Sequence, residues 1–255
     1  MTTPSESPSD APSKVPEVTL IFWVLKILAT TLGETAGDTL SMTLALGYLA
    51  ATAVFAVIFV AMVAAQIAAR RFHPWVYWAT IIATTTVGTT LADFATRSLG
   101  IGYAGGSTLL LLLLLGSLAV WYRTTGTVSV ESVRTPREES FYWVTIMFSQ
   151  TLGTALGDWT ADTAGFGYGG AAVVFGGLLA LIAAAYFRTR ISRTALFWAA
   201  FVLTRPLGAV LGDLLDKPVA SGGFAFSRPL ASAVLLTAML ACLLLFPQRA
   251  AGRAH

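Results

Sequence analysis

The sequence predicts an all-α membrane protein with about eight transmembrane helices, built from four parallel two-helix repeats. Of its 255 residues, 56% are hydrophobic and only 11% are charged, whereas about a quarter are charged in ordinary globular domains. Apolar stretches of about 20 residues, long enough to cross a bilayer, recur along the chain. The third observation is a sequence signature that returns four times.

The signature begins with an aromatic pair and ends with an aspartate. The aspartate follows the tryptophan of the pair by fifteen residues in every copy, and a glycine follows the aspartate by nine. The aspartates are Asp38, Asp93, Asp158 and Asp213, and the glycines are Gly47, Gly102, Gly167 and Gly222. Such a repeat predicts four equivalent structural units.

The hydropathy pattern places spans at 18–40, 44–69, 75–97, 104–123, 140–161, 166–187, 195–216 and 229–247. In each repeat the first span carries the signature and the second is a nearly featureless apolar helix. Repeats one and two form a first half (18–123), and repeats three and four form a second half (140–247). We expect a polar linker over 124–139, a disordered cytoplasmic tail over 1–17, because it is rich in Ser, Thr and Pro, and a second tail over 248–255.

The distribution of basic residues predicts the orientation. Eleven of the 16 lysines and arginines lie at one set of span ends, including Arg70, Arg71, Arg137 and Arg193. Basic ends face the cytoplasm, so we expect both termini to be cytoplasmic, in a bacterial cytoplasmic (inner) membrane. Two spans per repeat give all copies the same direction. Four parallel copies can close into a ring or form two facing halves, and the sequence does not choose between these.

The aspartates form a candidate cation site. Carboxylates at one membrane depth are costly and therefore ask for a function, although capping of a neighbouring turn is an alternative explanation. Pairs of small residues four apart, such as Gly33/Gly37, let the helices approach closely. Hard cations prefer oxygen ligands. The predicted metal ligands are Glu34, Asp38, Asp93, Asp158 and Asp213.

Polar residues halfway along the signature spans form a candidate transport route. Seven and eight residues after the tryptophans, the sequence places Thr30, Thr31, Thr85, Thr86, Gln150, Thr151 and Arg205. A mid-span arginine requires a partner, and Glu34 is the expected one if the fourth repeat adjoins the first. We expect Lys26 to reach the inner interface, and Arg97 and Lys217 to be solvated near the outer surface.

The four copies of Trp…Thr-Leu-Gly-x-x-x-Gly-Asp…Gly-Tyr resemble a bacterial four-repeat integral membrane family of unknown function, whose members are usually labelled uncharacterised membrane-anchored proteins. The resemblance covers Ile21 to about Leu245 and implies no substrate. The fourth copy departs from the pattern at Arg205-Pro206 and at Gly223. More loosely, Glu34-x-x-Gly37-Asp38 is similar to the Glu-x-Gly-Asp motif of calcium and manganese exchangers, with one extra residue.

These patterns favour a transporter of a small cation, with a divalent metal such as manganese as the expected substrate and proton coupling as an option. The alternatives are an ion channel with an outer carboxylate ring, and a membrane scaffold or sensor that transports nothing. No enzyme motif is present, so we expect no catalytic activity and no cofactor. The expected partners are the lipid bilayer and a small cation, without nucleic acid; a homo-oligomer is left open.

Overall fold

The computed structural model describes residues 13–252, which form eight long helices. Their bounds are α1 Leu20–Asp38, α2 Tyr48–Ala68, α3 Pro74–Asp93, α4 Gly102–Thr125, α5 Pro136–Asp158, α6 Gly167–Arg188, α7 Arg193–Asp216 and α8 Arg228–Leu245. The predicted two-helix repeats are confirmed. In the first three repeats the aspartate ends the α-helix, and a five-residue π-helical turn follows it: η2 (Thr39–Thr43), η3 (Phe94–Ser98) and η5 (Trp159–Thr163).

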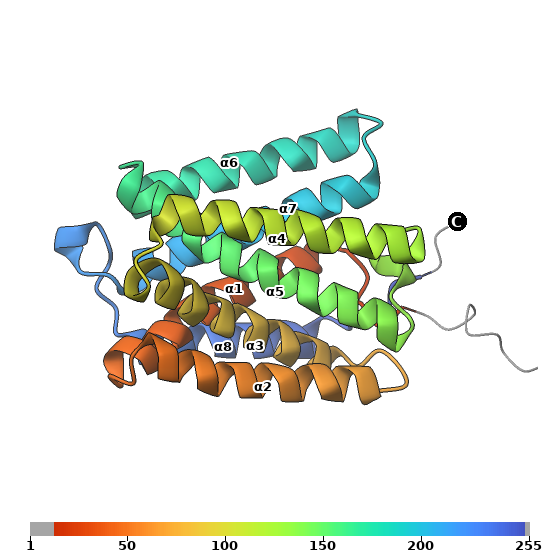
Figure 1. Cartoon of the computed structure of the whole chain (residues 1–255), viewed down its shortest axis with the longest axis horizontal. Coiled ribbons are helices and arrows are strands. Elements are labelled where there is room, and N and C mark those ends of the chain that lie inside the picture. The colour runs from red at the N-terminus through yellow and green to blue at the C-terminus, as the bar shows by residue number, and fades with distance from the viewer. Residues whose placement is uncertain (1–12, 253–255) are drawn as a thin grey trace, which may run out of the picture.

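The helices form two layers, an inner ring and an outer cover (Figure 1). The four signature helices contact one another in the order α1, α3, α5, α7, and α7 returns to α1, so the ring is closed. Each outer helix packs on the inner helix of the following repeat: α2 on α3, α4 on α5, α6 on α7 and α8 on α1. The closed ring is therefore the arrangement that this sequence adopts.

Composition explains which helices lie inside. The outer helices expose apolar side chains along their length, such as Val57 on α2 (71% exposed) and Leu181 on α6 (66%). Six of the described helices are long and apolar enough to cross a membrane, and α3 and α5 are the two that are not. Both belong to the inner ring, where neighbouring helices cover their polar residues; α3 alone buries Thr80, Thr84, Thr85, Thr86, Thr89 and Thr90.

The glycines that begin each small-residue pair bring the inner helices together. A Cβ atom added at Gly33 would overlap Thr85, one at Gly153 would overlap Arg205, and one at Gly208 would overlap Thr30. At Gly88 it would lie 3.0 Å from the Cβ atom of Gln150. Each of these glycines therefore packs against the next inner helix of the ring, at the residue seven positions after that helix's tryptophan. Close packing in lipid requires such small residues.

The repeated glycines nine residues after each aspartate have a backbone role. Gly47, Gly102, Gly167 and Gly222 all have positive φ angles, between 65° and 86°. Residues with a Cβ atom are strained in this region. These glycines therefore allow the chain to turn after the signature helix and, in the first three repeats, enter the outer helix directly.

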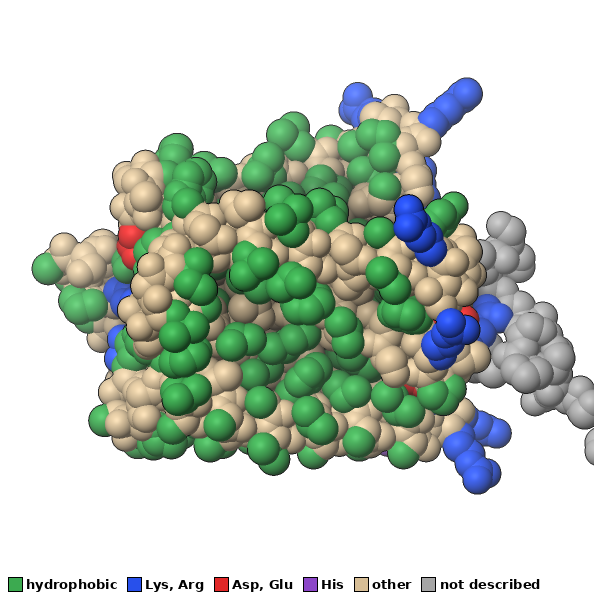
Figure 2. All heavy atoms as spheres, viewed as in Figure 1, with side chains coloured by type: hydrophobic (Ala, Val, Ile, Leu, Met, Phe, Trp, Pro, Cys, Tyr) green, Lys and Arg blue, Asp and Glu red, His purple; other side chains and the backbone are tan. Residues whose placement is uncertain are grey.

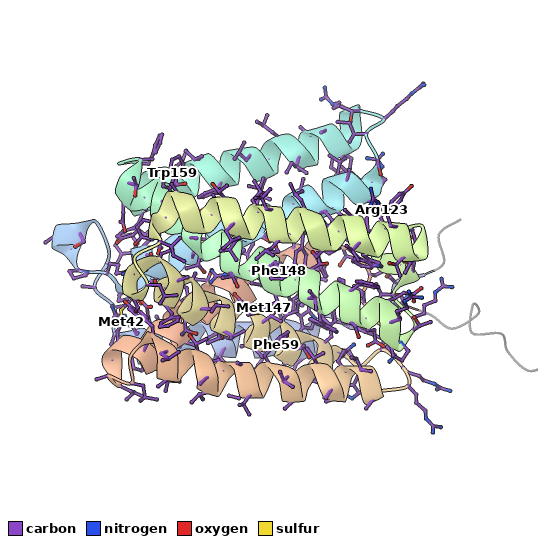
Figure 3. All side chains as sticks on the ribbon, viewed as in Figure 1. Met42, Phe59, Arg123, Met147, Phe148 and Trp159 are labelled. Atoms are coloured by element: carbon purple, nitrogen blue, oxygen red, sulfur yellow. The ribbon has the colours of Figure 1, made fainter. Side chains whose placement is uncertain are left out.

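The two ends of the ring differ in charge. We call the end where α1 begins the basic end and the end where it reaches Asp38 the acidic end. Lysine and arginine side chains gather at the basic end, and apolar side chains cover the flank between the ends (Figure 2). Arg123 marks the basic end, whereas Met42 and Trp159 mark the acidic end (Figure 3).

Aromatic residues close the ring at its basic end. Trp78, Trp143 and Trp198 are at most 6% exposed, and the Tyr77 and Tyr142 hydroxyl oxygens are 2.6 Å apart. The closed ring turns these three tryptophans toward one another, and they form one buried cluster with Phe22 and Phe197.

Residues 13–17 pack against this basic end, in contrast to the disordered tail expected over 1–17; residues 1–12 lie outside the described part. The Lys14 Nζ atom lies 2.6 Å from Glu139 Oε1 and donates to backbone carbonyls at the end of α2. The Val15 carbonyl accepts a hydrogen bond from Ala251 N at 2.8 Å. The loop between α4 and α5, within the predicted linker, also packs here, because Val130 and Val133 are buried.

Candidate ion site within the helix ring

Residues spaced four apart on the inner helices form layers across the ring. Counting back from each signature aspartate in steps of four gives five layers, each with one residue per inner helix. From the acidic end these are Asp38/Asp93/Asp158/Asp213, Glu34/Thr89/Thr154/Ala209, Thr30/Thr85/Gln150/Arg205, Lys26/Ile81/Ile146/Phe201 and Phe22/Tyr77/Tyr142/Phe197. All twenty residues are buried. The third layer holds four of the residues predicted to form the route, and the next layer holds Lys26.

All four aspartates are at most 3% exposed, and basic side chains hold them in two pairs. Arg97 joins the second and third repeats, because its Nε lies 2.9 Å from Asp93 Oδ1 and its Nη2 lies 3.1 Å from Asp158 Oδ2. Lys217 joins the fourth and first repeats, because its Nζ lies 2.9 Å from both Asp213 Oδ1 and Asp38 Oδ2. The two basic residues occupy the same repeat position, four after the aspartate.

This arrangement corrects the expectation that Lys217 is solvated, because its side chain is only 13% exposed. Arg97 remains exposed at the acidic end, as expected, and its side chain is 33% exposed. Both follow from charge, since two carboxylates on adjacent helices attract one basic side chain toward the space between them. The structure thus has a twofold pattern within the fourfold ring.

A third carboxylate joins one of the pairs. Asp216 is 7% exposed, and one carboxylate oxygen from each of Asp38, Asp213 and Asp216 lies within 4.8 Å of the others. Arg228, at the start of α8, lies 3.2 Å from Asp216 Oδ2 and 3.5 Å from Asp38 Oδ2. Three oxygens at this separation could coordinate a divalent cation once the basic side chains withdraw.

Arg205 and Glu34 form the expected buried pair between the fourth and first repeats. Arg205 Nη2 lies 3.0 Å from Glu34 Oε2, and the two side chains are 0% and 4% exposed. The same nitrogen donates to the hydroxyls of Thr89 at 2.6 Å and Thr154 at 2.5 Å. Arg205 therefore contacts all three other inner helices and crosses the centre of the ring.

The remaining route residues are all buried, but their hydroxyl groups have different partners. Thr31, Thr86 and Thr151 donate to the carbonyl four residues earlier in their own helices, at 2.8–3.0 Å. Thr30 donates to carbonyls of α1, as close as 2.9 Å. For Thr85 Oγ1 and both amide atoms of Gln150, the described part of the chain offers no hydrogen-bond partner.

Lys26 does not reach the interface as expected. It is fully buried, and its Nζ lies 4.1 Å from the centre of the Phe201 ring. The aromatic cluster and residues 13–17 cover the basic end beyond it, so the lysine has no path to water along α1. Span ends are the least certain part of a sequence prediction, so the distance of Lys26 from the interface could be misjudged from the sequence.

Sequence reasoning missed Thr89, Thr154, Asp216 and Arg228 as members of the polar ring interior. Thr89 and Thr154 occupy the repeat position of Glu34, so alignment of the four copies at that position would have found them. Asp216 and Arg228 have no counterparts in the other repeats, and only the path of the chain places them near Asp38.

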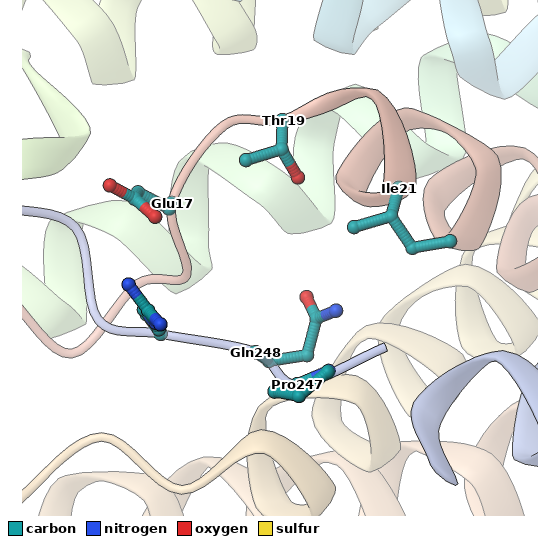
Figure 4. Close-up of a pocket in the computed structure, with 6 residues that line it drawn as sticks. Glu17, Thr19, Ile21, Pro247 and Gln248 are labelled. Carbon is teal, nitrogen blue, oxygen red and sulfur yellow. The ribbon is translucent and has the colours of Figure 1, made fainter. Parts of the chain in front are cut away.

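A shallow pocket of about 220 Å³ lies at the opposite end of α1 from Asp38 (Figure 4). Glu17, Thr19, Ile21, Pro247, Gln248 and Arg249 line it, so it opens between the two terminal segments. None of the predicted site residues contributes to it.

Comparison with protein families identifies the repeat. A family model described as "Repeat of Unknown Function (DUF347)" matches residues 21–72, 76–127, 141–192 and 196–248. Each match contains one signature helix and one outer helix. No curated protein and no solved structure is significantly similar to the chain. The four matches span most of the sequence, and the chain belongs to this family.

Proposed function

We propose that this member of the DUF347 repeat family is a membrane transporter for a small cation, with a divalent metal such as manganese as its substrate. The observation that carries the proposal is the buried aspartate layer, in which two basic side chains, Arg97 and Lys217, each bridge carboxylates from two different repeats. A position between two carboxylates that holds an ammonium or guanidinium group also suits a metal ion.

The charge balance at the acidic end supports a cation rather than an anion as substrate. Five buried carboxylates, Asp38, Asp93, Asp158, Asp213 and Asp216, face three basic residues, Arg97, Lys217 and Arg228. The excess of two negative charges, which becomes three when Lys217 withdraws, attracts a cation and repels an anion. Carboxylates that lose a cation in such a site favour proton uptake, so proton coupling is part of the proposal.

Lys217 is the side chain that we expect the substrate to displace. It follows α7 directly, its backbone is extended, and it retains some exposure. Its withdrawal would leave Asp38, Asp213 and Asp216 with oxygens close enough to share one ion. Arg97 is the equivalent basic side chain between Asp93 and Asp158, and its separate charge-assisted hydrogen bonds to the two carboxylates favour a structural role for that pair.

The closed basic end favours a transporter over a channel. The aromatic cluster and residues 13–17 fill the ring there, so an ion entering from the acidic end requires a conformational change to leave. We further propose that the basic end faces the cytoplasm of a bacterial inner membrane, because cytoplasmic ends carry the excess of arginine and lysine.

The test is uptake of Mn²⁺ by proteoliposomes that contain an entrapped fluorescent reporter. Asp38→Asn removes one charge from the aspartate layer and keeps its shape, and we expect loss of uptake. Asp162→Asn is the matched control, because Asp162 is an exposed aspartate near the same end, and we expect normal uptake. Lys217→Met should strengthen Mn²⁺ binding, because it removes the competing cation.

Several outcomes would count against the proposal. Uptake at the wild-type rate by all four single Asn variants of the aspartate layer would show that the layer is not the site. If none of a panel of divalent and monovalent cations is taken up by the proteoliposomes, the result would support a membrane scaffold that transports nothing. Uptake that never saturates and needs no proton gradient would support a channel.

A further inference from the structure

The middle of the ring contains a second group of polar atoms, separate from the aspartates. Lys26 Nζ is buried and has no hydrogen-bond partner within residues 13–252. The same holds for Nε and Nη1 of Arg205, although its Nη2 is fully used. Lys26 precedes Asp38 by twelve residues, so it lies about 18 Å deeper along α1.

The charges in this region do not balance. Between the aromatic layer and the aspartate layer, the inner helices carry three charged side chains: Lys26, Glu34 and Arg205. Glu34 is already paired with Arg205, so a protonated Lys26 has no acidic partner among these three side chains. Lys26 Nζ lies over the ring of Phe201, one helical turn before Arg205 on α7, so the charged neighbour of Lys26 on that helix is a like charge. The face of the Phe201 ring offsets only part of the cost of an unpaired ammonium group.

The neighbouring uncharged groups are also without partners. Gln150 occupies the repeat position of Arg205 on α5, and both of its amide atoms are buried and unbonded to any described residue. The stem of Arg205 packs against Gly153, one helical turn from Gln150 on the same helix. Buried polar groups in folded proteins almost always have a partner, so this group of donors requires one that the chain does not supply.

We propose that a small monovalent inorganic anion of the chloride class binds between Lys26, Arg205 and Gln150. The ammonium group, the free guanidinium N–H groups and the Gln150 amide N–H groups are all donors to an anion. With Lys26 protonated, one bound anion brings the net charge of Lys26, Glu34 and Arg205 from +1 to zero. This site goes beyond the proposed cation site, because binding of an anion to Lys26 requires neither the aspartates nor transport.

The experiment measures the thermal stability of the purified full-length protein in detergent, in sodium chloride and in sodium gluconate at equal ionic strength. A ligand that binds only the folded state raises the melting temperature. We expect a saturable rise of about 3 °C or more at a chloride concentration of about ten times its Kd. Bromide should produce the same effect as chloride, and gluconate is too large to enter.

Two variants and one control locate the effect. Lys26→Met should abolish the dependence on chloride, and Gln150→Leu should weaken it. Lys14→Met is the matched control, since Lys14 is also buried but pairs with Glu139, so this variant should keep the full chloride effect. If Lys26→Met fails to fold, the wild-type titration and Gln150→Leu still decide the question.

Equal melting temperatures of the wild-type protein in chloride and gluconate would overturn the proposal, and Lys26 would then be buried as a neutral amine. A chloride effect that is unchanged in both Lys26→Met and Gln150→Leu would also overturn it. Neither result depends on whether Mn²⁺ crosses the membrane, so failure of the anion site and failure of the cation transporter can be told apart.

Discussion

The pair formed by Arg205 and Glu34 gives the sharpest test of how the ring is held together. We consider Arg205→Leu, Glu34→Leu and the double variant. Removal of one partner from a buried ion pair leaves the other charge uncompensated, at a cost of about 3–5 kcal/mol. Glu34→Leu should be the more damaging, because it leaves Arg205 and Lys26 as two unopposed positive charges in the ring.

The double variant should recover much of this loss. It removes one charge of each sign, so the net charge of the ring interior stays as in the wild type. What remains lost is the hydrogen bonding of Arg205 to Thr89 and Thr154, and such bonds contribute about 0.6 kcal/mol each within membranes. We therefore expect the double variant to lose about 1–2 kcal/mol, less than either single variant.

Melting temperatures in detergent provide the measurement, because about 1 kcal/mol shifts the melting temperature of a chain of this size by about 2–4 °C. Arg70→Leu serves as the control, since Arg70 is exposed at the basic end and its replacement should change the stability by less than about 0.5 kcal/mol. Losses that simply add in the double variant would refute the reasoning.

Three further predictions follow from the packing, the terminal segment and the charge distribution. Gly208→Ala should lower the melting temperature, because the new methyl group overlaps Thr30, at a cost of about 1–3 kcal/mol; Gly176→Ala, which meets open space, should not, and equal effects would contradict the packing argument. Lys14→Met should expose residues 13–17 to limited proteolysis, because the ion pair that fastens them is lost; an unchanged cleavage pattern would show that the other contacts suffice. Reporter fusions after Arg71 should report cytoplasm and those near Leu99 the opposite side, and the reverse result would overturn the proposed orientation.

The sequence predicted the parts of the fold that repeat. The spacing of tryptophan, glycine and aspartate located all four inner helices, because helical periodicity and small-residue packing act locally. The Arg205–Glu34 pair was also predictable, since each is an exception within a regular repeat and each is costly alone. The pairing of the aspartates with Arg97 and Lys217 was not predicted, because both basic residues sit at span ends, where a sequence gives no measure of exposure.

Features that depend on the path of the chain could not be predicted. Nothing in the hydropathy pattern indicates that α2 covers α3 rather than α1, since both helices of a repeat are apolar enough to pair. The order of residues 13–17 was missed for a related reason. Their composition is typical of a disordered segment, and only the contacts of Ser13 and Val15 with distant residues at the basic end fix them.

The packing of each outer helix on the inner helix of the next repeat has a consequence for biosynthesis. Because each outer helix covers the inner helix of the following repeat, α1 is covered by α8, which is synthesised after the other seven long helices. Arg205, the ion-pair partner of Glu34, is synthesised 171 residues after it. Until α7 has been made, α1 therefore carries Glu34 without its partner. A chain that stops before α7 would leave Glu34 without its ion pair, so we expect such truncated chains to insert α1 less efficiently.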